Sequence, residues 1–399
     1  MLTRKQIKNR WKKYYLSGLL FVVFIAVYFL SNIFFISKNS NTLNEESSYT
    51  RSYGGALVNE ENNLKYRNGS RLWIEYAQAL VKKNKPTPPE SARFYAYVAS
   101  VYADALAVKG DNIQASLAVK EIINQIMSSD IDQTQKYFNE ITGNSSELIS
   151  PETTPIIKKY QDREKNDGKS SLIWDGIIPT GDGKWVGKNP LSPRAGEWTR
   201  WILDQNHDFE TPLPPTYNSA EDKKELEIVT NAVKSRNDKE WLPKIEFWAG
   251  GPGTEAPLGI WLNRLYEETK NQKISDMQFA RYQKILTQTV ADAFMECWKV
   301  KFTYWTARPS MRMKKLSTTQ NDPNFPSYLS GHSTISRAAA EVLSKMIPEK
   351  EQVWIDNAKE ARDTRLVSGI HFQIDNDAGF DLGEKIGKQV ISKIDITTY

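Results

Sequence analysis

The sequence is poor in the residue types that build most protein metal sites. Among its 399 residues are one cysteine, Cys297, and three histidines. A single cysteine excludes an intrachain disulfide and a zinc site that takes two or more thiolates from this chain. It also excludes a lipid anchor on an N-terminal cysteine, because Cys297 lies far from that end. The three histidines are therefore the first candidates for chemistry.

Acidic residues are missing from the first 37 positions, which hold six basic ones: Arg4, Lys5, Lys8, Arg10, Lys12 and Lys13. The whole chain has 53 Lys and Arg against 48 Asp and Glu, so the remainder is close to neutral. The basic character thus belongs to the N-terminal tail and gives no argument for nucleic-acid binding by the rest of the protein. We expect no nucleic-acid partner.

The basic tail, 1–15, is followed by 21 residues without a charge, Leu16–Ile36. As a helix this segment would be about 31 Å long, which matches a bilayer core of about 30 Å. We predict an uncleaved membrane anchor. A cleaved signal peptide is the alternative, although the SKNSN sequence that follows lacks a small-residue cleavage site. The basic flank should stay in the cytoplasm, which places the remaining residues on the extracytoplasmic (periplasmic or extracellular) side.

Helical periodicity dominates the rest of the chain. A polar linker, 37–70, separates it from the apolar segment. Apolar residues then recur at intervals of three and four in the runs 71–83, 88–109 and 112–127. Residues 143–200 are rich in loop-forming residues, and helical patterns return from Ser219 nearly to the end. We find neither sustained strand-like alternation nor an internal repeat, so we predict one all-α domain over residues 71–399.

One histidine follows Ser-Gly at a predicted helix start, in the stretch PSYLSGHSTISRAAAEVL. The first backbone N–H groups of a helix are unpaired and point at whatever lies before them, which makes a helix start a place for anions. His332, with Ser330 and Gly331, can therefore border an anion site. Taken alone, such a histidine is more often a surface or capping residue.

Two cations precede this histidine in CWKVKFTYWTARPS. Lys301 and Arg308 are seven residues apart, which on a helix returns to within about 20°, so we expect both on one helix face. Trp298 lies one turn before Lys301 on the same face. A Lys-Arg pair of this kind is usually a solvated surface, so it becomes informative only with partners.

Possible partners of Lys301 and Arg308 occur later in the chain, in TRLVSGIHFQIDND. This stretch contains Arg365, His371 and Asp375. The four-residue spacing of His371 and Asp375 lets the carboxylate hold one imidazole nitrogen and leaves the other free to act. A local salt bridge is the ordinary interpretation of such a pair. The third histidine, His207, lies far away in a loop-rich segment.

Together these residues suit one ligand, a tetrahedral oxyanion. Guanidinium groups bind its oxygens in a bidentate manner. The Ser330 hydroxyl and the Gly331 N–H would add neutral donors. One histidine could attack or ligate the central atom, and the other could give a proton to a leaving oxygen.

The three motifs K-x6-R-P, P-S-x-x-S-G-H and R-x5-H-x3-D occur here in this order. They resemble the signature of the phosphatidic acid phosphatase type 2 / vanadium haloperoxidase superfamily. The residues that match are Lys301, Arg308, Pro309, Ser330, Gly331, His332, Arg365, His371 and Asp375. The resemblance implies an all-α helical bundle with the site residues between positions 298 and 375.

The resemblance also implies a role for each matching residue. His332 would be the acid/base, and His371 would be the phosphate nucleophile or the ligand of vanadate. Asp375 would orient His371. The oxyanion oxygens would be bound by Lys301, Arg308, Arg365, Ser330 and Gly331.

Three further segments, PPESARFYAYVASVYADAL, GKWVGKNPLSPRAGEW and FWAGGPGTEAPLGIW, resemble the bacterial haloperoxidase-like branch. The likeness therefore covers residues 88–399. Trp298 and Phe325 resemble the aromatic pair beside vanadate in chloroperoxidases, where they would face the halide or substrate. The alternative is that both simply pack in the core.

The sequence departs from the family pattern at four positions. Leu329 stands where the second motif normally has Pro, and Thr364 where the third normally has Ser. We expect both to be tolerated, because neither position supplies a catalytic group. Gly250 and Ile260 replace an expected Asp and His, which puts contacts to the substrate in doubt rather than the oxyanion site.

Three functions follow from these expectations. The first is a vanadate-dependent haloperoxidase that uses peroxide and a halide, with vanadate on His371. The second is a phosphoester hydrolase that works through a phosphohistidine on His371 and requires no cofactor. The third is a non-catalytic oxyanion-binding protein. The first two predict a small-molecule substrate, and they require both histidines and the cations to converge on one pocket, with Asp375 touching His371.

Overall fold

The computed structural model describes residues 69–394, all of which lie in one compact unit, Gly55–Tyr399. The helices are α2 (Gly69–Asn84), α3 (Pro88–Lys109), α4 (Asn112–Ile126), α5 (Ile131–Thr142), α6 (Thr154–Asn166), α7 (Ala220–Lys234), α8 (Asp238–Trp248), α9 (Ala256–Thr269), α10 (Asp276–Tyr304), α11 (Pro309–Arg312), α12 (Gly331–Met346), α13 (Glu351–Val367) and α14 (Gln373–Lys393). Short 3₁₀ turns lie at Ser128–Asp130, Ala195–Glu197 and Pro348–Lys350.

The prediction of an all-α architecture is confirmed for these residues. Between residues 69 and 394 there is no strand, only one antiparallel bridge between Lys184 and Thr306. The same stretch contains no helix long and apolar enough to cross a membrane. The predicted anchor Leu16–Ile36, the tail 1–15 and most of the linker 37–70 lie outside the described residues.

Helix α3 begins and ends at the capping residues that the sequence offers. The Thr87 side chain caps α3, Glu90 completes the capping box, and two prolines open the helix. Gly110 ends α3 in the left-handed conformation that glycine adopts without steric cost. The predicted run 88–109 is thus confirmed at both ends. Two helices were not expected: α5, which follows the predicted run 112–127, and α6, which lies within the loop-rich stretch. Helix α6 buries only Ile157 and Tyr160, and so few apolar positions give no helical pattern.

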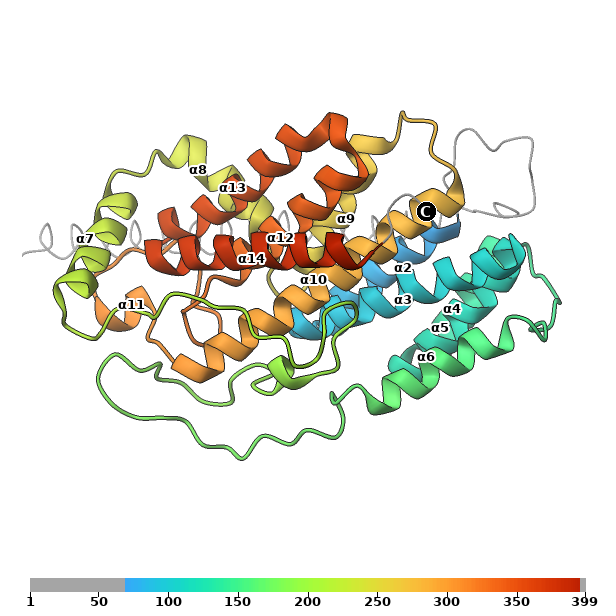
Figure 1. Cartoon of the computed structure of the whole chain (residues 1–399), viewed down its shortest axis with the longest axis horizontal. Helices are drawn as coiled ribbons and strands as arrows, with labels where there is room; N and C mark the ends of the chain where they lie inside the picture. Colours follow the sequence, from blue (N-terminus) through green and yellow to red (C-terminus); the bar gives the residue numbers. More distant parts are fainter. Residues whose placement is uncertain (1–68, 395–399) are drawn as a thin grey trace, which may run out of the picture. The chain divides into compact units, whose positions relative to one another are not determined.

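The longest helix, α10, runs through the middle of the bundle and packs against α3 and α12 (Figure 1). Its buried residues occur all around its circumference, as expected for a helix surrounded by others. On the other side of α12 lie α13 and α14. Figure 1 shows α12 and α14 side by side, and this pair carries the ends that build the site.

Three glycines at four-residue intervals allow α14 to approach α12 closely. A Cβ atom would lie 2.8 Å from the Ser330 carbonyl oxygen at Gly379, 2.2 Å from the Thr334 carbonyl oxygen at Gly383, and 2.3 Å from the Glu341 Cβ at Gly387. Glycine lowers helix propensity, so its presence on one face marks close backbone contact. The contact aligns the N-terminus of α12 with the N-terminus of α14.

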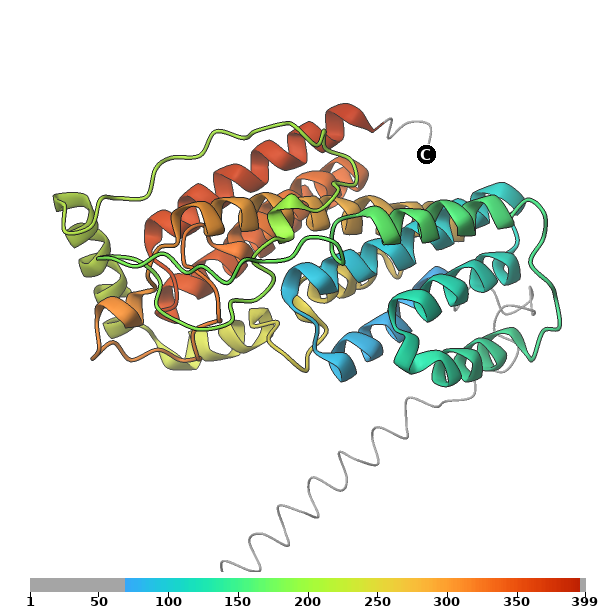
Figure 2. The same ribbon diagram turned by 90° about the horizontal axis from the view of Figure 1, so that it is seen from below.

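A long segment without regular helices connects α6 to α7 and passes along the bundle beside α10 (Figure 2). Two buried carboxylates of α10 hold this segment against the bundle. Asp292 accepts hydrogen bonds from the backbone N–H groups of Trp201, Ile202 and Leu203, and Glu296 pairs with Arg200. These contacts satisfy backbone groups that a loop lying on the core would otherwise leave unpaired.

Candidate active site

The histidine of the third motif lies in the turn between α13 and α14, and its side chain is 3% exposed. Its Nδ1 lies 2.9 Å from Oδ2 of Asp375, one turn into α14. The same Oδ2 accepts the hydroxyl of Ser327 and the backbone N–H of Phe372. Asp375 therefore caps its own helix and holds His371 at once, which leaves Nε2 as the ring nitrogen that the carboxylate does not engage. The predicted contact between Asp375 and His371 is confirmed.

Three cations surround this histidine, and all three are buried. Lys301 donates through Nζ to the carbonyl oxygens of Pro326, Ser327 and Leu329. Arg308 donates through Nε to the Phe325 carbonyl at 3.0 Å and through Nη1 to the Ile370 carbonyl at 2.8 Å. Its Nη1 also lies 3.4 Å from Nε2 of His371.

The third cation, Arg365, donates through Nε to the hydroxyl of Thr364 at 3.0 Å. Its Nη2 is buried and has no hydrogen-bond partner. Within residues 69–394, none of the three cations forms an ion pair with a carboxylate. Backbone carbonyls compensate their charge only partly, so the site carries an unbalanced positive charge.

Each cation has a lowered pKa, although Asp375 acts in the opposite direction at Lys301 and Arg308. Burial is the main cause in every case, and it lowers the pKa of Lys301 to about 8, of Arg308 to about 10 and of Arg365 to about 9. Repulsion from Arg308 adds to the effect at Lys301 and at Arg365. An anion placed among these groups would remove that penalty and would therefore be bound strongly.

One expectation about the cations is wrong. Lys301 and Arg308 do not share a helix face, because α10 ends at Tyr304. Trp305 adopts the left-handed conformation with φ 54°, and Arg308 follows as the N-cap of the short helix α11. The chain turns back here, so both cations reach the site from different directions. The placement of Trp298 one turn before Lys301 is confirmed.

The histidine of the second motif lies in the first turn of α12, as predicted. Ser330 is the N-cap of this helix, and its Oγ accepts the N–H of Ser333 at 3.4 Å, which leaves its hydroxyl hydrogen free to donate. The Ser330 N–H donates to the Asp375 carbonyl oxygen at 2.9 Å, so the starts of α12 and α14 touch. The Ser-Gly turn and its histidine therefore open directly onto the third motif.

His332 itself is half-buried, and its Nε2 is enclosed without a partner. Burial lowers its pKa well below the usual value, and the charge of Arg365 lowers it further. Hydrogen bonding to the backbone of Trp248 and Ala249 opposes this shift in part. His332 is therefore neutral near pH 7, with one ring nitrogen available for a proton.

The charges of these groups affect one another's pKa. Burial lowers the pKa of His371 well below its usual value, and Arg308, Lys301 and Arg365 lower it further in that order. The pKa of His332 responds to Arg365 and to His371. These mutual shifts agree with a shared site, and the convergence of both histidines and the three cations on one pocket stays a prediction.

The aromatic pair predicted beside the oxyanion lies next to the cations. The rings of Trp298 and Phe325 are 4.8 Å apart, and Nζ of Lys301 lies 5.2 Å from the centre of the Phe325 ring. The Trp298 indole donates to the Leu191 carbonyl at 3.1 Å. Both side chains are also buried in the core, so they pack there and border the site at once. A Cβ at Gly331 would lie 3.6 Å from the Trp298 ring, which places Trp298 against the start of α12.

The four departures from the family pattern have structural explanations. Thr364 retains the hydroxyl that binds Arg365, and Leu329 contributes its carbonyl oxygen rather than its side chain. Gly250 has φ 57°, and a Cβ there would lie 2.9 Å from the Pro257 nitrogen, so the backbone requires glycine. Ile260 is buried in α9 as part of the core.

Sequence reasoning missed two contributions to the site. Ser327 holds Asp375, and its Oγ also lies 3.3 Å from Nδ1 of His371. It stands in the second motif, three residues before Ser330, which is the only sequence signal it offers. The backbone of Trp248 and Ala249 that holds His332 gives no sequence signal, because any residue supplies the same carbonyl.

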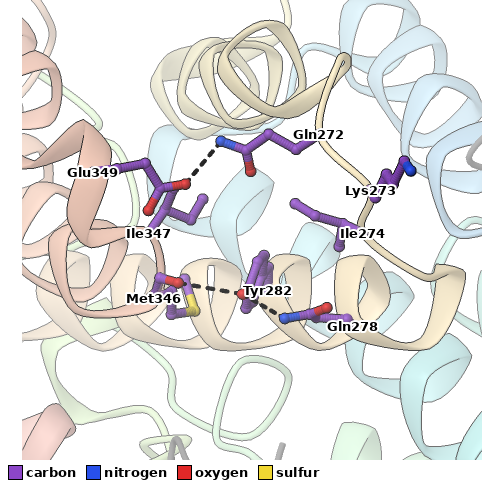
Figure 3. Close-up of a pocket in the computed structure, with 8 residues that line it drawn as sticks. All are labelled: Gln272, Lys273, Ile274, Gln278, Tyr282, Met346, Ile347 and Glu349. Atoms are coloured by element: carbon purple, nitrogen blue, oxygen red, sulfur yellow. Dashed lines mark hydrogen bonds between the residues drawn. The ribbon is translucent and has the colours of Figure 1, made fainter.

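A separate cavity of about 440 Å³ lies elsewhere (Figure 3). Its lining includes Tyr282, Met346 and Glu349, near the start of α10 and the end of α12. Tyr282 and Lys301 are 19 residues apart on α10, which corresponds to about 28 Å. Residues 69–394 contain no group of three or more His, Cys, Asp or Glu side chains arranged to hold a metal ion.

The site fits an oxyanion such as vanadate or phosphate. Nη2 of Arg365 and Nε2 of His332 are buried without partners. An oxyanion has an oxygen to accept from Nη2, and Nε2 could accept from a protonated oxygen of the same anion. Nε2 of His371, 3.4 Å from Nη1 of Arg308, is the ring nitrogen that could ligate the central atom if that contact is given up. The three uncompensated cations supply the charge that a multiply negative ion needs.

No protein-family profile matches the sequence, and no curated protein is detectably similar to it. Solved structures are similar in fold. A bacterial vanadium-dependent iodoperoxidase superposes with a TM-score of 0.69 at 18% identity, covering 82% of this chain and 96% of that chain.

Two crystal structures of bacterial vanadium-dependent chloroperoxidase are also similar. The apo form has a TM-score of 0.63 at 13% identity, covering 77% of this chain and 93% of that chain. The holo form has a TM-score of 0.58 at 12% identity, covering 86% and 96%. The chain therefore has the fold of bacterial vanadium-dependent haloperoxidases, as its three motifs indicated.

Proposed function

We propose that this chain, which has the fold of bacterial vanadium-dependent haloperoxidases, is an oxyanion-site enzyme that binds vanadate and oxidises halide ions. The observation that carries the proposal is the set of three buried cations without carboxylate partners, whose charges lower the pKa of His371 and one of which contacts its Nε2. The overall reaction would consume hydrogen peroxide, a halide ion and a proton, and would yield hypohalous acid and water. Vanadate, when bound, would supply the activation of peroxide.

Each residue would contribute through its own atoms. Nε2 of His371 would ligate vanadium, because Nδ1 is already engaged by Asp375. The oxyanion oxygens would be bound by Lys301, Arg308, Arg365, the Ser330 hydroxyl and the Gly331 N–H. Nη2 of Arg365 has no partner and the Ser330 hydroxyl hydrogen is free, so both can donate with little reorganisation. Nζ of Lys301 already donates to three backbone carbonyls, so it would act through its charge or by exchanging one of those bonds.

His332 would handle the proton. Because burial and the charge of Arg365 keep it neutral, its Nε2 can accept a proton from incoming peroxide and return it to the oxygen that leaves as water. Trp298 and Phe325 would exclude water on the halide side of the site, since both rings pack beside Lys301. A drier site strengthens every charge interaction within it.

A phosphoester hydrolase is the second candidate, favoured by the way His371 is held. It is neutral, buried and oriented by Asp375, which are the properties of a histidine nucleophile. Nε2 would form a bond to phosphorus while the ester oxygen departs as the alcohol, with a proton that His332 has first accepted from the incoming phosphate monoester monoanion. Water would then cleave the phosphohistidine, passing one of its own protons to His332, which gives it up as phosphate is released. This reaction requires no cofactor.

The decisive experiment uses purified, vanadium-free protein. Vanadate with peroxide should produce oxidation of bromide or iodide, and phosphate should suppress it by competing for the same cations. His371→Ala should abolish the activity, whereas His207→Ala, in the distant loop, should leave it unchanged. Hydrolysis of phosphate esters without oxidation of any halide would overturn the first proposal in favour of the second. Vanadate binding with neither activity would favour a non-catalytic oxyanion-binding protein.

We also propose that the catalytic part lies on the extracytoplasmic side of a membrane, held by Leu16–Ile36. The support is the sequence alone: a charge-free run preceded by a tail whose charged residues are all basic. A reporter fused to the C-terminus should be active only outside the cytoplasm. Activity of such a reporter in the cytoplasm would contradict the proposal, and a mature N-terminus after Ile36 would replace the anchor with a cleaved signal.

A further inference from the structure

The start of α14 lacks a cap from its own N-cap residue. Phe372 holds that position, and its side chain has no hydrogen-bond acceptor. The first N–H groups of a helix have no partner within the helix and must be satisfied by other groups. Asp375 accepts the N–H of Phe372 at 3.2 Å, which leaves the following N–H groups to another partner.

That partner is a carboxylate from a distant helix. Oε2 of Glu225, in α7, accepts the N–H of Ile374 at 3.0 Å, and Glu225 also receives a backbone hydrogen bond from Gln373. The residues are 149 positions apart, so this is a helix cap supplied by tertiary packing. Figure 1 shows α7 beside the end of the bundle where α14 begins.

Helix α7 also holds the segment that follows the first motif. Asp222 pairs in a bidentate manner with Arg312, at 2.9 and 2.7 Å, only four residues after Arg308. The Thr230 hydroxyl lies 3.3 Å from the sulfur of Met313. One face of α7 thus contacts the segment carrying Arg308 and the helix carrying Asp375.

We propose that Glu225 is a positioning residue for the His371–Asp375 pair. By fixing the first turn of α14, it fixes the carboxylate that holds Nδ1 of His371 and aims Nε2 at the oxyanion. It touches neither oxyanion nor substrate. The catalytic importance of this orientation rests on the proposed function. The effect of Glu225 on the orientation of His371 does not.

The test compares Glu225→Gln with Glu225→Leu in the full chain. The side chains are similar in size, and only the glutamine can still accept the N–H groups of α14. The readout is the ring nitrogen NMR spectrum of ¹⁵N-histidine-labelled protein without vanadate. The chain has only three histidines, so substitution of each assigns the signals.

The wild type and Glu225→Gln should show His371 as one tautomer, protonated on Nδ1. Glu225→Leu should show a mixture of tautomers or exchange-broadened signals at His371 alone. Turnover in whichever reaction the site performs should fall about 10- to 100-fold in Glu225→Leu, with KM nearly unchanged, and Glu225→Gln should restore it. Glu227→Leu, on the exposed face of the same helix, is the matched control and should match the wild type.

A His371 spectrum in Glu225→Leu identical to that of the wild type would overturn the proposal. Equal disturbance by Glu225→Gln and Glu225→Leu would also overturn it, because the charge and not the cap would then matter. Should the leucine variant not fold, Glu225→Asp replaces it, since it keeps the charge and withdraws the acceptor by one methylene. It should disturb His371 as described for leucine, and a wild-type spectrum would contradict the proposal. If the wild type has neither halide-oxidising nor phosphate-ester-hydrolysing activity, the proposed function is refuted. The comparison of the His371 spectra is not affected by that result.

Discussion

Oδ2 of Asp375 lies 2.9 Å from Nδ1 of His371, and the same oxygen also receives the hydroxyl of Ser327 and the N–H of Phe372. One carboxylate oxygen therefore joins the third motif, the second motif and the start of α14. It decides which nitrogen of His371 carries the proton, and so which nitrogen can act.

Asp375→Asn should lower turnover by about 100-fold or more while leaving the fold intact. The asparagine has the same shape, but its amide can turn its NH₂ towards His371 and favour the wrong tautomer. Steady-state kinetics measures the loss, and circular dichroism verifies the fold. Asp377→Asn, an exposed position in the same helix, should behave as the wild type. Equal turnover in both variants would show that Asp375 does not orient His371.

Stability should fall as the pH drops below about 6.5 in phosphate-free buffer. Burial and nearby cations lower the pKa of His332 and His371 in the folded state, so below 6.5 the unfolded chain binds more protons. Each histidine adds a slope of up to about 1.4 kcal/mol per pH unit to the free energy of unfolding. Glu296, whose pKa burial raises to about 7, acts in the opposite direction.

Comparison of histidine variants with the wild type isolates the contribution of His332 to this pH dependence of stability. Urea unfolding at pH 7.5 and 5.5 should give a smaller difference in His332→Gln than in the wild type, whereas His207→Gln should not change it. An unchanged difference in His332→Gln would mean that His332 titrates normally in the folded protein.

Gly383→Ala should destabilise the protein. Alanine improves helix propensity by about 1 kcal/mol, but the added Cβ would lie 2.2 Å from the Thr334 carbonyl oxygen. Overpacking of this kind costs about 1–3 kcal/mol, so we expect a net loss of stability. Gly251→Ala, where a Cβ meets nothing within 4 Å, should be nearly neutral in the same thermal unfolding measurement. A Gly383→Ala variant as stable as the wild type would contradict the close packing of α12 and α14.

If the site hydrolyses phosphate esters, His332→Ala should affect substrates unequally. An alkyl phosphate needs a proton on its leaving oxygen, and loss of the general acid should cost about 100-fold or more. Nitrophenyl phosphate releases nitrophenolate, which leaves without that proton. Its rate of hydrolysis should therefore fall much less. The two rates measured side by side test the assignment, and equal losses would place the acid elsewhere.

Much of the site could be predicted from sequence because its parts are local. The four-residue spacing of His371 and Asp375, and the Ser330 cap at the start of α12, are properties of single helices. The position of Arg308 could not be predicted in the same way, because a left-handed Trp305 ends α10 without a glycine or proline signal.

The supporting contacts could not be predicted either. Glu225 reaches α14 only because α7 packs beside it, and 149 residues separate the two partners. Backbone carbonyls that bind Lys301 and Arg308 carry no side-chain signature at all. Tertiary packing, not sequence pattern, determines these contacts.

The central claim is that the buried cations and His371 form one oxyanion site, and equilibrium binding of vanadate to the vanadium-free protein tests it most directly. Calorimetry should find one vanadate per chain, displaced competitively by phosphate. His371→Ala should bind vanadate at least about 10-fold more weakly, because it lacks the nitrogen ligand, while its affinity for phosphate changes little. His207→Ala should bind both as the wild type does. Vanadate binding that phosphate does not displace, or that His371→Ala leaves unchanged, would contradict the account.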